Sequence, residues 1–399
     1  MIEVFHVTFS QSGGAGKIAT RLAKAQEEMG ISTEVVCLTD KDVRGSWYRL
    51  PILTITALVD FFIVRKNGSK NLFTLFRKTM RNQILNKYNF SDKVVHLHWY
   101  AGLFNSEDLD LIFNRARKVI ITMHDMWPIT GGCHFSDECT LYRSSCSGCP
   151  QVKKPFRNKV SKTYKQKHES FQRSKNLVFT SPGLWLCEEL KHSNFGQHLK
   201  TFHILNPVDK DFFVDPEPDN EKMQGNGTER IFIIGFCAND VSEPRKNFIE
   251  AYQSFLQVRE LYFGKTEVKF HVVGRFSKDY LNEYPLANFL GKMNTQSDLV
   301  KAYQHFDILL SLSKAETYPN VVHECAAMGI PSVLSRINAH SHASGNFAVT
   351  VDSAEKAVDA IDQLIKDSNL YLDLQTKCKS YVEKNKMEVI AKQYIDLYR

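Results

Sequence analysis

The chain has 399 residues, of which 43% are hydrophobic and 24% are charged. This ordinary globular balance excludes a disordered, collagen-like or coiled-coil chain, and the length predicts two domains. The formal charge of +7 is uneven, because residues 1–200 hold 29 Lys and Arg against 17 Asp and Glu, whereas residues 201–399 hold 22 against 27. The basic first half predicts an anionic partner, which can be a phosphate-bearing substrate, a membrane surface or nucleic acid.

The sequence predicts a cytoplasmic protein. Its first residues, MIEVFHVTFS, lack the basic and apolar regions of a secretory signal. The longest apolar run, near residues 50–64, is shorter than the ~20 residues of a membrane-spanning helix and is interrupted by Asp60. We therefore expect the nine cysteines to lie in a reducing compartment, where structural disulfides are rare.

The first half of the chain predicts a doubly wound sheet. Residues 2–9 read as a buried strand, residues 10–16 as a glycine-rich loop, residues 17–29 as an amphipathic helix and residues 32–38 as a second strand. This βαβ unit is the usual start of such a sheet. Further strands are expected at residues 94–98, 119–123 and 177–180.

A second α/β series is predicted after a loop or linker over residues 215–228, which is rich in Pro, Gly, Asn and charge. Strands are expected at residues 230–236, 268–273, 306–312 and 330–334, and helices at residues 248–258, at 320–328 and over most of the last 45 residues. Ligands bind at the carboxyl ends of the strands in such sheets, so we expect the site in a cleft between two tandem domains.

The loop Ser12–Lys17, SGGAGK, has part of a phosphate-binding pattern. A P-loop requires GxxxxGK[ST], but Gln11 stands at the first glycine and Ile18 replaces the magnesium-binding hydroxyl. Two interpretations remain equally supported by the motif alone. One is a tight turn whose amides face a phosphate, and the other is a plain strand-to-helix turn.

Two carboxylates stand eight residues apart in Glu316–Glu324, ETYPNVVHE. Pro319 can precede the first turn of a helix, which would place Glu316 in a loop after a strand and Glu324 inside the helix. Such a pair can accept hydrogen bonds from the hydroxyls of a sugar or a ribose. The spacing alone favours two solvated surface acids.

The wider stretch Asp307–Val333, DILLSLSKAETYPNVVHECAAMGIPSV, resembles the donor-site signature of retaining glycosyltransferases of family 4, which have the GT-B fold. The signature positions matched in order are Glu316, Glu324, Ala327, Gly329 and Pro331. The resemblance implies that Glu316 contacts the donor hexose, that Glu324 binds the ribose and that the backbone amide of Asn320 contacts the donor. The family often continues with a Gly-Gly…Glu segment, whereas residues 335–341 read SRINAHS. The donor sugar therefore stays open.

The same resemblance assigns a basic pair. Lys246, with Arg245 supplying the second charge, would neutralise the donor diphosphate as it leaves. The alternative is a solvated pair at a helix start, which is an unfavourable place for cations unless an anion binds there.

The resemblance also assigns residues in the first half. His124 and Asp125, in the segment 122–128 that reads TMHDMWP, match the active-site histidine region beside the donor hexose and the acceptor. Gly13 and Gly14 would lie beside the diphosphate or the acceptor. The residues His98 and Trp99 would line the acceptor side.

Four cysteines, Cys133, Cys139, Cys146 and Cys149, stand within 17 residues, and the last two form a CxxC knuckle that can turn both thiolates to one metal. A subset of the family carries a similar cysteine-rich insertion. We expect a structural zinc ion, with His134 as a substitute ligand, while unligated thiols or disulfides are the alternative. The resemblance implies that catalysis itself needs no metal.

Two segments combine basic and aromatic residues. Residues 65–81 carry six Lys and Arg and no acid, and residues 153–175 carry nine with Glu169 as the one acid. With Phe73, Phe76 and Phe156 between them, they predict binding to an anionic lipid surface, at about 1 kcal/mol for each basic residue. Two solvated helix faces are the alternative.

The resemblance implies two Rossmann-like domains facing a cleft. These are an acceptor-binding domain over residues 1–205, a nucleotide-sugar domain over 206–380, and a C-terminal helix over 381–399 that packs back on the first domain. It implies a retaining hexosyltransferase that uses a UDP- or GDP-hexose, similar to bacterial enzymes of surface polysaccharide biosynthesis.

The charge of the first half adds an expected lipid-diphosphate-linked glycan acceptor, such as an O-antigen, capsule or exopolysaccharide unit, at the inner face of the plasma membrane. Two rivals remain open. One is a basic, zinc-stabilised nucleic-acid-binding protein, although no nucleic-acid recognition motif is present and we expect no nucleic-acid partner. The other is an inactive GT-B module that binds glycan.

Overall fold

The computed structural model describes residues 2–11, 13–37, 72–75, 81–196, 198–214, 231–343 and 345–399. The chain forms two compact units. Unit 1 comprises Met1–Pro207 together with Met387–Arg399, and unit 2 comprises Val208–Lys386. The apolar run at residues 50–64 and the expected linker at 215–228 lie outside the described residues.

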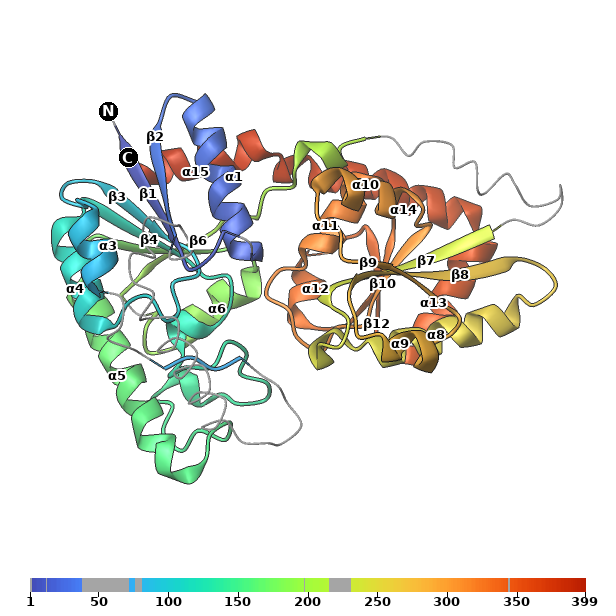
Figure 1. Cartoon of the computed structure of the whole chain (residues 1–399), viewed down its shortest axis with the longest axis horizontal. Helices are drawn as coiled ribbons and strands as arrows, with labels where there is room; N and C mark the ends of the chain where they lie inside the picture. Colours follow the sequence, from blue (N-terminus) through green and yellow to red (C-terminus); the bar gives the residue numbers. More distant parts are fainter. Residues whose placement is uncertain are drawn as a thin grey trace. The chain divides into compact units, whose positions relative to one another are not determined.

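Unit 1 contains a six-stranded parallel sheet in the order β2-β1-β3-β4-β5-β6 (Figure 1). Its strands are β1 (Glu3–Thr8), β2 (Ser32–Cys37), β3 (Val94–Leu97), β4 (Lys118–Thr122), β5 (Leu177–Ser181) and β6 (Lys200–His203). The four central strands, β1, β3, β4 and β5, are buried along nearly their whole length, as expected of parallel strands covered on both faces. The chain runs from β1 outward to β2 and then returns to the other side of β1, so the strand order reverses between β1 and β3.

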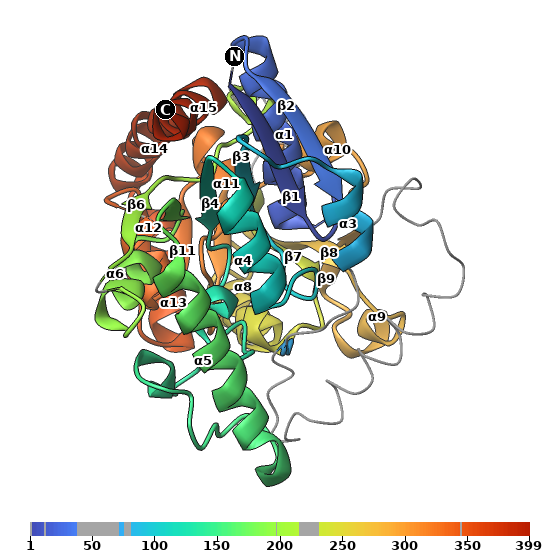
Figure 2. The same ribbon diagram turned by 90° about the vertical axis from the view of Figure 1, so that its left-hand side faces the viewer.

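Helices cover both faces of this sheet. They are α1 (Gly14–Glu28), α3 (Arg81–Lys87), α4 (Ser106–Arg115), α5 (Arg157–Arg173), α6 (Leu184–His192) and α15 (Met387–Tyr398). The helices α4 and α5 lie side by side in Figure 2, and they pack on the face opposite to α1 and α15. Helix α4 begins with a complete capping box, in which Asn105 and Asp108 satisfy each other's backbone amides.

The last helix completes unit 1. In α15, Ile390, Tyr394 and Tyr398 are buried against α1 and the sheet. The backbone carbonyl of Leu397 accepts a hydrogen bond from Nζ of Lys118 (2.7 Å), which places a cation at the negative end of the helix dipole. The carboxyl end of the chain therefore lies in the same core as β1.

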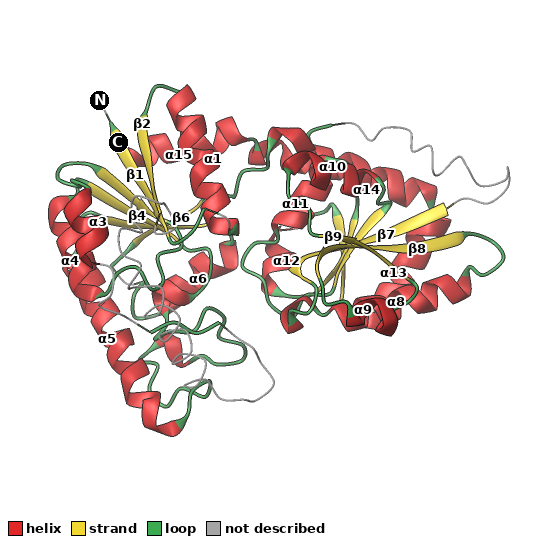
Figure 3. Cartoon of the chain, viewed as in Figure 1, coloured by secondary structure: helices red, strands yellow, loops and turns green. Residues whose placement is uncertain are grey.

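Unit 2 contains a second parallel sheet in the order β12-β11-β10-β7-β8-β9. Its strands are β7 (Ile231–Asp240), β8 (Glu267–Arg275), β9 (Ala287–Gly291), β10 (Ile308–Ser311), β11 (Ser332–Ser335) and β12 (Ala348–Val351). Its helices are α8 (Phe248–Leu261), α9 (Asp279–Glu283), α10 (Gln296–Gln304), α11 (Asn320–Ala327), α12 (Asn338–Ala343), α13 (Ala354–Lys366) and α14 (Ser368–Val382). Strands alternate with covering helices throughout both units (Figure 3).

The structure confirms the predicted fold class of two parallel α/β sheets in tandem. Several boundaries differ by a few residues. The one that matters for the glycine loop is α1, which begins at Gly14 and not at residue 17, so two of the loop glycines belong to its first turn. Within the described residues, no helix is both long and apolar enough to cross a membrane.

Candidate functional site

The candidate donor site lies at the carboxyl edge of the sheet in unit 2. The chain runs from β7 outward to β8 and β9, and then returns to the other side of β7 to form β10. The strand order therefore reverses between β7 and β10, and ligands of open α/β sheets bind at this kind of switch point. Arg245 and Lys246 follow β7 in the short turn η6 (Pro244–Lys246), and Glu316 follows β10.

Glu316 joins the two basic residues. Its Oε2 accepts a hydrogen bond from Nη1 of Arg245 (2.9 Å), and its Oε1 accepts one from Nζ of Lys246 (2.5 Å). The side chain of Glu316 is only 9% exposed, against 15% for Lys246 and 25% for Arg245. The structure thus brings together the three residues to which the sequence assigned the donor hexose and diphosphate.

The two cations shape the electrostatics of this cluster. Burial alone would raise the pKa of the Glu316 carboxyl, but Lys246 and Arg245 outweigh it and lower that pKa to about 2. Arg245 also bonds Glu243, through Nε at 2.5 Å. Two carboxylates therefore balance two cations here, and any anionic ligand would have to compete with Glu316 for the same donors.

Three further residues at this edge have no signal in the sequence analysis. Ser313 donates to Oε1 of Glu316 (3.1 Å), and Ser335 donates to the backbone carbonyl of Ser313 (2.5 Å). His340 of α12 contacts Ser335 through Nδ1, while its buried Nε2 has no hydrogen-bond partner among the described residues. His340 lies in the SRINAHS segment that departs from the family pattern, so this departure places a buried imidazole within electrostatic range of Glu316.

The remaining donor-site candidates lie on α11. Asn320 is its first residue, and the backbone amide of Asn320 donates to the carbonyl of Tyr318 (3.0 Å). Glu324 lies one turn further, where it accepts a hydrogen bond from the hydroxyl of Tyr303 (3.4 Å). Contact of either residue with a nucleotide sugar stays a prediction.

In unit 1 the glycine loop occupies the corresponding switch point, after β1. Gly13 caps α1 and Gly14 opens it, and a Cβ at either position would meet no atom within 4 Å. Gly16 differs, because a Cβ there would lie 1.8 Å from the carbonyl oxygen of Ser10. The glycine at 16 is thus required by packing, whereas those at 13 and 14 leave open space beside the start of a helix.

His98 and His124 meet at the carboxyl ends of β3 and β4. Nδ1 of His98 lies 3.2 Å from Nε2 of His124, and burial lowers the pKa of His124 to about 4. Beside them, Nε1 of Trp99 donates to Oδ2 of Asp125 (2.7 Å). The structure therefore brings these four predicted residues of unit 1 into two contacting pairs.

Asp125 is buried and holds the loop after β4. Its two oxygens accept hydrogen bonds from Trp99, from the backbone amide of Trp127 (2.8 Å) and from Nδ1 of His134 (2.6 Å). His134 also contacts Thr74 through Nε2 (3.1 Å). Both ring nitrogens of His134 thus have partners other than the thiols, and its role as a substitute zinc ligand stays a prediction.

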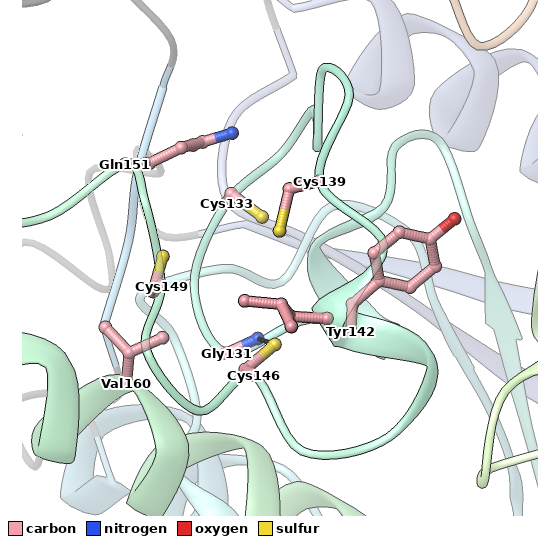
Figure 4. Close-up of a pocket in the computed structure, with 9 residues that line it drawn as sticks. Gly131, Cys133, Cys139, Tyr142, Cys146, Cys149, Gln151 and Val160 are labelled. Atoms are coloured by element: carbon pink, nitrogen blue, oxygen red, sulfur yellow. Dashed lines mark hydrogen bonds between the residues drawn. The ribbon is translucent and has the colours of Figure 1, made fainter.

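The four predicted cysteines line one small pocket (Figure 4). All are free thiols, and burial raises the pKa of Cys146 to about 12. The backbone amide of Gly131 donates to Sγ of Cys146 (3.2 Å), a bond that suits a thiolate ligand. Among the described residues, His6, His96 and His98 form the one potential metal-binding group whose ligating atoms lie within 4.8 Å of one another. The four thiols therefore line the same pocket but are further apart than ligands of one metal ion.

The basic segment at 153–175 forms η4 (Lys154–Phe156) and α5, with several exposed lysines. Lys167 is an exception, because it is buried and its Nζ donates to the carbonyls of Trp127 (2.5 Å) and Thr130 (3.0 Å). Phe73 is 4% exposed and belongs to the core, and Phe156 packs against it. The expected contact with lipid is therefore wrong at Phe73, stays a prediction at the partly buried Phe156, and falls outside the described residues at Phe76.

Comparison with known proteins identifies unit 2. Residues 231–367 match the sequence model of a family described as glycosyl transferases group 1. The candidate residues Arg245, Lys246, Glu316, Asn320 and Glu324 all lie inside this matched region of unit 2.

The whole chain is also similar to a putative colanic acid biosynthesis glycosyl transferase, WcaC, of Escherichia coli K12. The two are 22% identical over 357 residues, which cover 84% of this chain and 83% of the relative. The matched family and this relative are both described as glycosyl transferases.

Solved structures share the fold over the full chain. HepE of Anabaena, in complex with UDP and glucose, has a TM-score of 0.62 at 14% identity, covering 100% of this chain and 99% of that one. WaaG, a glycosyltransferase involved in lipopolysaccharide biosynthesis, has a TM-score of 0.58 at 13% identity, with 100% and 99% covered. The two Rossmann-like units have the GT-B fold of these structures.

Proposed function

We propose that the chain is a retaining hexosyltransferase that moves a sugar from a UDP- or GDP-hexose to a lipid-diphosphate-linked glycan during surface polysaccharide biosynthesis. The cluster of Arg245, Lys246 and Glu316 at the switch point of unit 2 carries this proposal. The similarity to a putative colanic acid biosynthesis enzyme supports the pathway, and the UDP and glucose bound to HepE support the donor class.

The chemistry follows from where charge develops. Cleavage of the donor's anomeric bond leaves negative charge on the diphosphate, and Lys246 and Arg245 are cations already fixed at this edge. As the diphosphate takes over these donors, Glu316 is released to accept hydrogen bonds from hexose hydroxyls. The ammonium group of Lys246 and the guanidinium group of Arg245 neutralise the charge of the leaving diphosphate, so the proposal requires no metal ion for catalysis.

Unit 1 provides the acceptor side in this proposal. His124, Trp99 and the open glycines Gly13 and Gly14 stand at the carboxyl edge of its sheet. The exposed lysines of α5, which include Lys159, Lys162 and Lys165, favour an anionic lipid surface through charge alone. This supports a peripheral position on the inner face of the plasma membrane.

We also propose that Cys133, Cys139, Cys146 and Cys149 hold a structural zinc ion. Four thiols around one pocket are a donor set that zinc favours, and a CxxC knuckle supplies two of them. Burial raises the pKa of the Cys133, Cys146 and Cys149 thiols, so zinc must displace protons from these three to bind. The ion would tie together the loops that follow β4.

The donor site is tested with Glu316→Gln. We expect transfer from nucleotide sugars to fall by about 10²-fold or more, because the sugar loses a charged acceptor at the reacting end. Binding of free UDP, measured by calorimetry, is expected to stay equal or become tighter, since the diphosphate no longer competes with the carboxylate. A thermal-shift panel of UDP-, GDP- and ADP-sugars identifies the donor beforehand.

The matched control is Glu267→Gln, at the amino end of β8, where an exposed Glu pairs with Lys269 (3.8 Å). It makes the same charge change in the same sheet and should leave transfer unchanged. Equal transfer by the Glu316 and Glu267 variants would remove the donor role of Glu316. Stabilisation by a nucleotide sugar without any turnover would favour an inactive glycan-binding module, and tight salt-sensitive RNA binding would favour the nucleic-acid alternative.

A further inference from the structure

A row of histidines runs through the core of unit 1 and ends at His124. His6 on β1 and His96 on β3 are register partners in neighbouring parallel strands, so they lie on the same face of the sheet. His98 follows β3 and His124 follows β4. His6, His96 and His98 are fully or almost fully buried. The donor site of unit 2 uses none of them.

Three of these imidazoles form a chain of hydrogen bonds anchored on α1. Oε1 of Gln26 lies 2.9 Å from Nε2 of His6. Nδ1 of His6 lies 3.1 Å from Nε2 of His98, and Nδ1 of His98 lies 3.2 Å from Nε2 of His124. The amide nitrogen of Gln26 donates to the hydroxyl of Tyr398 (3.1 Å), which turns the amide oxygen towards His6.

The chain has a direction, because an amide oxygen can only accept. Nε2 of His6 must therefore carry a proton, and burial keeps this ring neutral by lowering its pKa to about 4. Nδ1 of His6 is then an acceptor, so Nε2 of His98 donates to it. The same step repeats once more, because burial also lowers the pKa of His98 well below its usual value, and Nε2 of His124 donates to Nδ1 of His98.

The three buried imidazoles could instead hold a metal ion, since ligating atoms of His6, His96 and His98 lie within 4.8 Å of one another. Each of their six ring nitrogens, however, already has a hydrogen-bond partner. His96 contacts Tyr398 through Nδ1 (2.8 Å) and Thr122 through Nε2 (2.7 Å), outside the chain that leads to His124. The arrangement therefore favours a hydrogen-bond chain.

We propose that Gln26, His6 and His98 are positioning residues that hold His124 as the Nε2–H tautomer, so that its Nδ1 is a fixed acceptor for a substrate hydroxyl. Among the described residues, Nδ1 of His124 has no hydrogen-bond partner, and the residue is partly exposed. A fixed acceptor selects the orientation in which a hydroxyl donates to His124, whereas the other tautomer would donate to that hydroxyl. Only the identity of the ligand as a sugar rests on the proposed function.

The tautomers can be measured without any substrate. Long-range 1H–15N NMR of the full chain, labelled with 15N-histidine, distinguishes Nε2–H from Nδ1–H rings, and the His124→Gln variant assigns the signal of His124. We expect His6, His98 and His124 all to be neutral Nε2–H rings at pH 7. An Nδ1–H ring at His124, or signals typical of metal-bound imidazoles at His6 and His98, would overturn the proposal.

Variants of the anchor test the coupling. Gln26→Leu removes the accepting oxygen, so His124 should become a mixture of tautomers. Transfer should fall about tenfold in kcat with little change in the KM of the nucleotide sugar, as expected for one misdirected hydrogen bond. Gln26→Glu retains an accepting oxygen and should restore both the tautomer and the rate.

The matched control is His96→Gln, which removes a buried imidazole of the same layer that is off the chain but retains an amide for Tyr398. It should leave the tautomer of His124 unchanged. If Gln26→Leu folds and the tautomer of His124 is unchanged, the coupling is refuted. If that variant does not fold, the tautomers measured in the unaltered chain still test the proposal. A chain that transfers no sugar at all would sink the proposed function while leaving the tautomer result intact.

Discussion

At the residue scale, the buried histidines make unit 1 sensitive to acid. Burial lowers the pKa of His6 and His124 to about 4 and that of His96 and His98 well below 6.5. The unfolded chain, whose histidines titrate near 6.5, then binds protons that the folded chain cannot accept. Stability is therefore complete above about pH 6.5 and falls as the pH drops towards 4.

We expect the unfolding free energy to fall by about 1.4 kcal/mol per pH unit for each such histidine between pH 6 and 5. Glu316 does not contribute in this window, because with its pKa near 2 its stabilisation is lost only below about pH 4.5. Urea titrations at several pH values measure the slope. The His96→Gln variant should have a shallower slope, and a stability that stays constant from pH 7 to 5 would contradict the neutral core.

The glycine loop gives a second test. In Gly16→Ala the new Cβ would collide with the backbone carbonyl of Ser10, so we expect a loss of about 1–3 kcal/mol of unfolding free energy. Gly14→Ala adds a methyl group to open space in the first turn of α1, and its unfolding free energy should stay the same or rise by up to about 1 kcal/mol. Chemical denaturation compares the two.

The same pair separates packing from ligand approach. If a phosphate or sugar approaches the loop, Gly14→Ala should impair transfer although it folds normally. Full transfer by Gly14→Ala would assign the loop to packing alone, which is the plain-turn interpretation.

The sequence predicted some residues of each hydrogen-bonded cluster but not the residues that connect them. The family resemblance assigned donor roles to Glu316 and Lys246, and the structure places these two side chains in contact. It did not predict Ser313 or His340, since a serine in a loop has no distinctive spacing. The contact of His6 with His98 spans 92 residues, and only the register of β1 and β3 brings it about.

At the element scale, the strands missing from the sequence prediction are β6, β9 and β12, and each is an edge strand. An edge strand is covered on fewer sides than a central one, so it needs less apolar sequence. The strand β6 reads KTFH with no buried residue, and β12 reads AVTV with one. The central strands were predicted because burial on both faces requires continuous runs of Val, Ile and Leu.

The described segment between β4 and α5 contains no strand and no long helix. Polar contacts and the four clustered cysteines stabilise it instead. Lys167 of α5 fixes the carbonyls of Trp127 and Thr130, and Asp125 fixes the loop from its other end. We expect the chain purified without chelator to contain about one zinc ion, bound by the four cysteines.

Metal analysis by mass spectrometry tests this expectation. Cys146→Ser and Cys149→Ser should lose the zinc and several degrees of melting temperature. Cys187→Ser is the control, because Cys187 is a buried thiol of the same unit whose carbonyl acceptors also suit a hydroxyl. A chain with no zinc, or with zinc that persists in both cluster variants, would contradict a cysteine site.

At the scale of the whole molecule, unit 1 is built from two separate parts of the chain. The sequence analysis expected a C-terminal helix that packs back on the first domain, and α15 lies in the core of unit 1. Removal of residues 387–399 would remove the buried side chains of Ile390, Tyr394 and Tyr398. The burial of each contributes about 1.5–3 kcal/mol to the free energy of unfolding.

We therefore expect the chain truncated after residue 386 to lose the thermal transition and protease resistance of unit 1, while unit 2 keeps its own. Differential scanning calorimetry and limited proteolysis measure the two units separately. Lys392→Ala, on the exposed face of α15, is the control and should leave both transitions unchanged. Equal protease resistance of the truncated and full chains would show that α15 is dispensable.

The discontinuity of unit 1 also sets an order for its maturation. Its first 207 residues leave the ribosome before unit 2 is made, but Gln26 and His96 meet Tyr398 only after the last helix has emerged. Until then the nascent β1 and α1 expose the apolar surface that α15 later covers. A chain interrupted anywhere in unit 2 therefore has an incomplete unit 1, whose exposed apolar surface chaperones and proteases recognise. Unit 1 can complete its core around β1 only after α15 has been synthesised.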